Sequence, residues 1–308
     1  MLRESAIGLV FDRHTLRRLR YSFGRSPKSF AVETDPDPET VAIVAKPFDD
    51  VEDVQDRLGR LESHLLDRDD RRAVFLTVYT EMTAETTAAI DAGEFNDAVW
   101  MRRYLICFAE YYRRAFLAFE RGSMAAVPDP WLVAFGTAHR GDALILQDAF
   151  LGINAHILYD LALTVSDVGT RPDRGRKYAD HRRIDGVLTR LVAVQRELLA
   201  DTYAPGLSRI GHGLGGRDER WSTEALERAR EFAWRAAIVR ADWSSPLLDA
   251  GVERLLSRTA TGGAYSLRAP LASLEAMAAL RRVEADEFEL GGFAIDFHNR
   301  VRASSTRR

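Results

Sequence analysis

The sequence contains one cysteine, Cys107, and this excludes two classes of small scaffold. A single cysteine cannot form an intramolecular disulfide, and it cannot supply the thiolates of a cysteine-rich zinc site. Cys107 lies in an apolar stretch with helical periodicity, where a buried structural cysteine is more typical than a nucleophile.

An excess of charge of one sign is also lacking. The 308 residues carry a formal net charge of −3, so no global field draws the protein to nucleic acid or to an anionic membrane. Only three of the 43 basic residues are lysines, which is typical of a GC-rich coding sequence and indicates no particular site. We therefore expect no nucleic-acid partner.

Long uninterrupted apolar runs are missing as well. The first residues alternate between charged and apolar types and never form the apolar core of a secretory signal. The most apolar helical stretch, 143–165, is interrupted by polar residues that a lipid-facing helix would not carry: Gln147, Asp148, Asn154, His156 and Asp160. The sequence thus predicts no membrane span and a cytoplasmic location.

Helical periodicity dominates what remains. Apolar residues recur at three- and four-residue steps from about Phe48 to about Glu287, and helix caps and stops divide this region into eight or nine segments. The best strand candidate, 41–45, is only five residues long. The sequence predicts an all-α protein with a single bundle over residues 48–287, followed by a tail over residues 288–308.

Residues 1–40 differ from the bundle. Arginine and lysine outnumber acidic residues here, and the stiff sequence Asp35-Pro-Asp-Pro38 separates the segment from the rest. We expect a loosely ordered basic tail. The alternative is a basic arm that binds an acidic partner.

The candidate chemistry lies on the most apolar helix. His156 and Asp160 are four residues apart, so they share one helix face, and Gly152 leaves room one turn earlier. A helix that is apolar nearly all round is buried, and its polar groups must find partners or coordinate an ion.

A second pair with the same spacing, His181 and Asp185, follows on the next predicted helix. If the two helices are antiparallel neighbours, both pairs converge, and four nitrogen and oxygen ligands suit zinc, manganese or iron. The same residues could equally form a hydrogen-bond network that holds the bundle in register.

Further polar residues complete the predicted site. Asp148 is a candidate general base, or a group that orients His156. Four others are candidate pocket residues: Gln147, Asn154, Asp97 and Asp180. The last two also suit plain structural roles, because each stands near the start of a predicted helix.

Four stretches together resemble an uncharacterised all-helical family, known only as domain of unknown function 5995. They are Val74-Phe-Leu-Thr-Val-Tyr-Thr-Glu-Met82, Val127-Pro-Asp-Pro-Trp131, Gly152-Ile-Asn-Ala-His-Ile-Leu-Tyr-Asp160 and Asp180-His-Arg-Arg-Ile-Asp185. The resemblance covers about residues 50–285. It implies a common helical fold and shared polar residues, and no activity.

The central stretch alone also resembles the metal-binding helix of zinc-dependent phospholipase C and P1 nuclease. Leu151-Gly-x-x-x-His156-x-Leu-x-Asp160 matches that helix, and His181 with Asp185 takes the place of its second pair. The family's Gln-Pro and further histidine are replaced by Leu163-Thr164 and Ser166, and its amino-terminal ligand has no counterpart. The resemblance therefore implies one or two metal ions instead of three.

Two functions follow. The first is a metal-dependent hydrolase of an ester or phosphoester, in which His156, Asp160, His181 and Asp185 hold the ion that activates water. The alternative is a non-catalytic small-molecule-binding or scaffold protein with a buried His/Asn/Asp network. The sequence does not specify the substrate or the oligomeric state.

Overall fold

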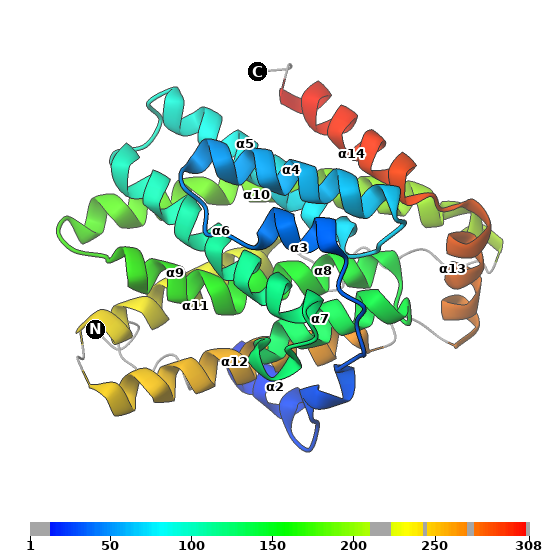
Figure 1. Ribbon diagram of the computed structural model, residues 1–308, viewed down its shortest axis with the longest axis horizontal. Coiled ribbons are helices and arrows are strands. Elements are labelled where there is room, and N and C mark those ends of the chain that lie inside the picture. The colour runs from blue at the N-terminus through cyan, green and yellow to red at the C-terminus, as the bar shows by residue number, and fades with distance from the viewer. Residues whose placement is uncertain (1–12, 210–222, 243–244, 270–273, 306–308) are drawn as a thin grey trace.

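The computed structural model describes residues 13–209, 223–242, 245–269 and 274–305, and all regular secondary structure in these residues is helical (Figure 1). The α-helices are α2 (Arg13–Ser22), α3 (Pro38–Val44), α4 (Val51–Asp67), α5 (Ala73–Asp91), α6 (Ala98–Glu120), α7 (Asp129–Arg140), α8 (Ile145–Ala155), α9 (Leu161–Val168), α10 (Arg174–Arg209), α11 (Thr223–Asp242), α12 (Pro246–Arg268), α13 (Leu274–Glu287) and α14 (Leu290–Ser305). Shorter elements are the 3-10 turns η2 (Pro27–Phe30) and η3 (Met124–Ala126) and the π-helical segment η4 (His156–Asp160).

The all-α class is confirmed, but eight or nine helices are too few. Elements α8, η4 and α9 join into one continuous helix, Ile145–Val168, and on this count the described residues form 12 helices. The three that the sequence pattern does not predict are α2, α3 and α14. Helices α2 and α3 are short, whereas α14 has buried apolar residues at three- and four-residue steps, Leu290, Phe293, Phe297 and Val301, within the segment expected to be a tail.

Helix α3 contains the stretch 41–45 up to Val44, so the strand candidate is wrong. The Asp37 side chain caps this helix by accepting a 2.8 Å hydrogen bond from the Thr40 amide, and Pro38 occupies the first turn. These two signals favour a helix start. Ile43 and Val44 are then buried where α3 packs against α4 and α6.

The continuous helix α8–η4–α9 crosses the middle of the molecule (Figure 1). It is long and apolar enough to span a membrane, but 83% of its most apolar window is buried inside the protein. Helices α5, α6, α7, α11 and α12 pack around it. This is the pattern of a core helix, and it is the one candidate span among the residues that the structure describes.

The basic amino-terminal segment is folded over its described part, 13–40. Helix α2 packs against α12, because Gly262 of α12 has no side chain: a Cβ there would lie 1.9 Å from the Arg18 carbonyl oxygen. Gly136 of α7 allows the same close approach to Phe30. Residues 1–12 lie outside the described part of the chain, and the predicted domain boundaries stay a prediction.

Helix α14, in the expected carboxyl-terminal tail, is held by one histidine. His298 bonds through Nε2 to Glu62 of α4 at 2.9 Å and through Nδ1 to Glu81 of α5 at 2.5 Å. These two hydrogen bonds raise the pKa of His298 to about 9. The protonated ring therefore links three helices at neutral pH.

We expect this link to make stability depend on pH. A histidine with a raised folded-state pKa stabilises fully below its unfolded pKa of about 6.5, and the contribution is lost as pH rises through about 9. Urea unfolding should show a loss of about 1–3 kcal/mol across this range in the wild type. His298→Gln should show little of this loss, whereas the exposed control His139→Gln should behave like the wild type. An unchanged pH slope in His298→Gln would contradict the assignment.

Candidate functional site

Three side chains form a hydrogen-bonded set at the π-helical segment. His156 Nδ1 lies 2.8 Å from Asp160 Oδ2, and Trp131 Nε1 of α7 donates to the same oxygen at 2.7 Å. Both members of the pair are buried, with 2% and 0% of their surfaces exposed. The structure thus brings together the first predicted pair and adds a tryptophan that the pair alone does not indicate.

Aromatic rings enclose the His156 imidazole. Phe108 of α6 stacks on it with ring centroids 3.5 Å apart, and Tyr79 of α5 lies edge-on at 4.5 Å. Phe75 and Tyr112 complete the enclosure at 5.7 and 6.1 Å. Phe108 and Tyr112 both belong to α6 and are themselves buried, so these rings form part of the core around His156.

Burial fixes the charge of this pair. It lowers the pKa of His156 well below its usual range and raises the pKa of Asp160 well above it. Both shifts oppose charge separation in an apolar environment. The pair therefore carries no net charge, and the hydrogen bond joins Nδ1 to Oδ2 without a free ion.

We expect Trp131→Phe to cost about 1–3 kcal/mol of unfolding free energy, because it leaves the buried Oδ2 of Asp160 without its indole donor. A double-mutant cycle with Asp160→Asn should show that the two effects are coupled. Trp100→Phe is the matched control, since its indole donates to the Gly169 carbonyl at 2.9 Å instead. Its cost should not change in the Asp160→Asn background. If the free-energy costs of Trp131→Phe and Asp160→Asn simply add in the double variant, the hydrogen-bond network is contradicted.

His181 and Asp185, the second predicted pair, bond to other residues instead of to each other. His181 Nδ1 bonds to the Tyr104 hydroxyl at 3.1 Å, and its ring lies against Trp234. Asp185 instead forms an ion pair with the buried guanidinium of Arg230 on α11, which also donates to the His181 carbonyl. Burial and the nearby Arg230 lower the pKa of His181 well below its usual range.

Asp180 and Asp97 have structural contacts. The Asp180 carboxylate accepts from the backbone amides of Asn96 and Asp97, at 2.8 and 2.9 Å. Asp97 in turn caps α6 by accepting from the Trp100 amide at 2.9 Å. These bonds fasten the start of α10 to the start of α6, which is the plain role that the sequence also allowed.

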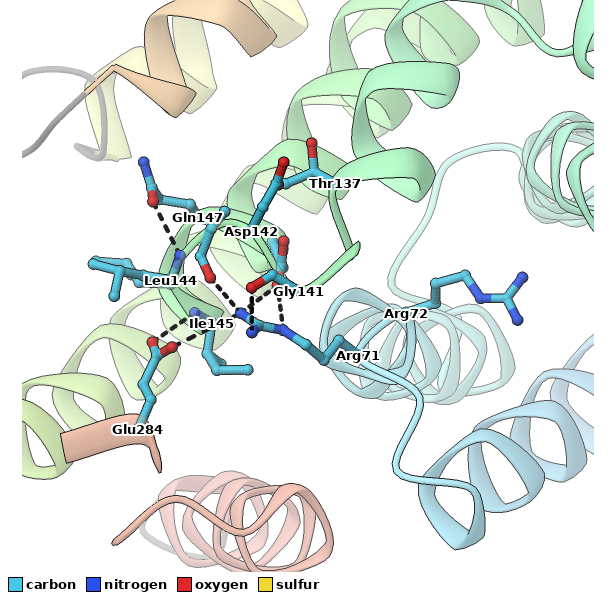
Figure 2. Close-up of polar contacts among 12 residues, drawn as sticks. Arg71, Arg72, Thr137, Gly141, Asp142, Leu144, Ile145, Gln147 and Glu284 are labelled. Atoms are coloured by element: carbon cyan, nitrogen blue, oxygen red, sulfur yellow. Dashed lines mark hydrogen bonds and ion pairs between the residues drawn. The ribbon is translucent and has the colours of Figure 1, made fainter. Parts of the chain in front are cut away.

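Gln147 and Asp148 hold the start of α8. Gln147 bonds to the Leu144 amide and to the Leu267 carbonyl, at 3.0 and 2.8 Å. Asp148 contacts Arg71 instead of His156, with Arg71 Nε 2.8 Å from Oδ2. Figure 2 shows Arg71 pointing into this cluster beside Glu284, while Arg72 points away.

Burial raises the pKa of Asp148 to about 7, although Arg71 partly opposes the shift. The folded state therefore holds a proton between about pH 4 and 7 that the unfolded state has lost, and stability falls as pH rises through this window. The stability difference between wild type and Asp148→Asn should change by up to about 1.4 kcal/mol per pH unit in that window. Urea unfolding at pH 5, 6, 7 and 8 measures this. Parallel curves for the two proteins would contradict it.

The four predicted ligands do not fit a divalent cation as the structure arranges them. No group of three or more His, Cys, Asp or Glu side chains suited to a metal occurs among the described residues. Asp185 is already neutralised by Arg230, whose buried positive charge would repel a metal ion placed beside it. Metal-dependent hydrolysis stays a prediction, and the contacts of these residues do not add to its support.

A pocket lies on the other side of the central helix. Its volume is about 110 Å³, and its walls come from α2, α8–η4, α10, α11 and α12. The lining residues are His14, Arg17, Arg18, Tyr21, Phe150, Ile153, Asn154, Ile157, Leu158, Val192, Ala225, Leu226, Arg228, Ala229, Gly263, Ser266 and Leu267. Of the four candidate pocket residues, only Asn154 lines it.

Asn154 and Gly263 shape one wall of this pocket. Asn154 Nδ2 donates to the Ala260 carbonyl of α12 at 2.8 Å. A Cβ at Gly263 would lie 2.2 Å from Asn154 Oδ1, so only glycine leaves space for this amide. The small residues of α12 therefore set the distance between α12 and the central helix.

The π-helical segment joins the two regions. Within its five residues, His156 and Asp160 contact the aromatic core, whereas Ile157 and Leu158 line the pocket. Single π turns inside α-helices are frequent at functional sites, because the extra residue changes which side chains face each neighbour. The hydrogen-bonded set thus holds the turn that forms part of the pocket wall.

Sequence reasoning missed the residues that come from distant helices. Trp131, Arg230 and Arg71 each complete a polar contact from 29 to 77 positions away along the chain. For Trp131 and Arg230 the only sequence signal is an aromatic or basic residue within a predicted helix, and Arg71 lies in the turn that precedes α5. The pocket arginines Arg17 and Arg18 lie in the segment that was expected to be a tail.

Comparison with known proteins places the chain in a family. Residues 51–270 match the profile of a family described only as a family of unknown function (DUF5995), and the chain belongs to it. Searches of curated proteins and of solved structures found no significant match. The family assignment is consistent with the helical region and brings no activity.

Proposed function

We propose that this member of the DUF5995 family is a helical small-molecule-binding protein, whose ligand occupies the pocket between α2, the central helix, α11 and α12. The observation that carries the proposal is the pocket itself: an apolar wall with a few polar groups, built around a π turn. Concave, mostly apolar sites between helices are the usual form of small-molecule sites.

The size of the pocket limits the ligand. An apolar cavity of about 150 Å³ holds one benzene ring. The pocket here is smaller, at about 110 Å³, and therefore suits a short alkyl chain. Phe150, Ile153, Ile157, Leu158 and Leu226 supply the apolar contacts.

The hydrogen-bonded set of His156, Asp160 and Trp131 supports this role, because it holds the helical segment that forms part of the pocket wall. It shows the features of a structural network: uncharged by burial, enclosed by aromatic rings and bonded to Trp131. Such a network gives the π turn one defined conformation. A fixed turn keeps Ile157 and Leu158 in place before a ligand enters, which lowers the ordering cost of binding.

Binding of 1-butanol, which is small enough for this volume, tests the proposal directly. We expect saturable binding to the full chain by titration calorimetry and by ligand-observed NMR, with Ile153→Trp reducing it by about tenfold or more because the indole fills the pocket. The matched control is Val99→Trp, an equal increase in size at an exposed position on α6. It should bind like the wild type. No saturable binding to the wild type, or equal binding by both variants, would overturn the proposal.

A further inference from the structure

The Asn154 side chain has a fixed orientation in the pocket wall. Its amide nitrogen Nδ2 donates to the Ala260 carbonyl of α12 at 2.8 Å. A carbonyl oxygen can only accept, so this bond determines which end of the amide is the nitrogen and which is the oxygen. Oδ1 then lies beside Gly263, where a Cβ would come within 2.2 Å of it, and both residues line the pocket. The amide oxygen thus occupies a part of the wall that stays open because residue 263 is glycine.

This oxygen has an unused capacity to accept a hydrogen bond. Within the described part of the chain, the bond to Ala260 is the one hydrogen bond of the Asn154 side chain, and it uses the nitrogen. Other unpaired side-chain atoms, such as Gln195 Oε1, are fully buried, and Asn154 Oδ1 is not one of these. A molecule in the pocket can therefore reach Oδ1 and donate to it.

We infer that the ligand is a small neutral alcohol whose hydroxyl donates a hydrogen bond to Asn154 Oδ1. This inference rests on the proposed function and specifies its ligand. Residues three and four apart are neighbours on a helix surface, so Ile157 and Leu158 lie next to Asn154 and supply the apolar wall for the alkyl chain. A mostly apolar pocket with one well-placed polar group is a common way to fix the orientation of a small ligand.

The same acceptor disfavours other head groups. An ether or ester oxygen has no hydrogen to donate, so its burial beside Oδ1 would bring two acceptors together. A carboxylate would add a negative charge to this conflict. An ammonium group donates, but a charge costs far more to bury than a hydroxyl, and no described lining residue carries a carboxylate to pair with it. The neutral hydroxyl is the head group that suits this wall best.

1-Butanol and its isomer methyl propyl ether provide the test, because the two molecules contain the same atoms and the ether lacks the hydroxyl hydrogen. Ligand-observed NMR titrations of the full chain measure both dissociation constants. We expect 1-butanol to bind the wild type about threefold more tightly or better, which is the effect of one net hydrogen bond. A pocket without an acceptor would give the opposite order, because the hydroxyl would lose its water contacts without replacement.

Asn154→Leu removes the acceptor and keeps the approximate size of the side chain. In this variant the ether should bind at least as tightly as 1-butanol. Ile153→Ala is the matched control, since Ile153 is the adjacent lining residue and is also partly exposed. It should weaken the binding of both ligands and keep the preference for 1-butanol. The ratio of the two affinities is the readout, so a general loosening of the pocket affects both ligands and does not imitate the result.

Equal or tighter binding of the ether by the wild type would overturn the alcohol assignment and leave the proposed function standing, and this comparison needs no variant to fold. A preference for 1-butanol that persists in Asn154→Leu, or one that Ile153→Ala abolishes equally, would also overturn it. If neither ligand binds the wild type saturably, the proposed function itself is overturned.

Discussion

The hydrogen bond from the Trp131 indole to the Asp160 carboxylate is the interaction on which the centre of this protein depends. The central helix is apolar on nearly every face, and each polar side chain on it needs a partner from a neighbouring helix. Trp131 supplies one for the His156–Asp160 pair from α7. Arg71 does the same for Asp148 from the start of α5, and the Ala260 carbonyl does so for Asn154 from α12. The bundle is thus specified by polar contacts as well as by apolar packing.

The same helix connects the core to the pocket. Its π turn directs His156 and Asp160 toward the aromatic side chains of α5, α6 and α7, and Ile157 and Leu158 toward α11 and α12. A change in the buried network would therefore alter the pocket wall. On the pocket side of this helix, Gly262 and Gly263 of α12 have a similar positioning role. Because they lack side chains, α2 and Asn154 can approach α12 closely.

The two His-x-x-x-Asp pairs show where reasoning from spacing succeeds and where it fails. The four-residue spacing correctly predicted the contact between His156 and Asp160, because residues four apart are neighbours on a helix surface. The identical spacing did not produce a contact between His181 and Asp185. Asp185 pairs with Arg230 instead, because a guanidinium is a stronger partner for a carboxylate than a neutral histidine. Nothing local distinguishes the pairs. The difference lies in which helix packs against each of them.

By itself, the sequence determined the helical class, the buried status of the central helix and the positions of most helices. These properties follow from periodicity and composition, which act over a few turns of chain. Only the tertiary structure decided the partners of Asp148, His181 and Asp185, the place of α2 against α12, and the pocket between them. Each of these requires residues that are far apart in the chain to meet, and a contact between distant helices depends on the shape of both surfaces, which no local pattern records.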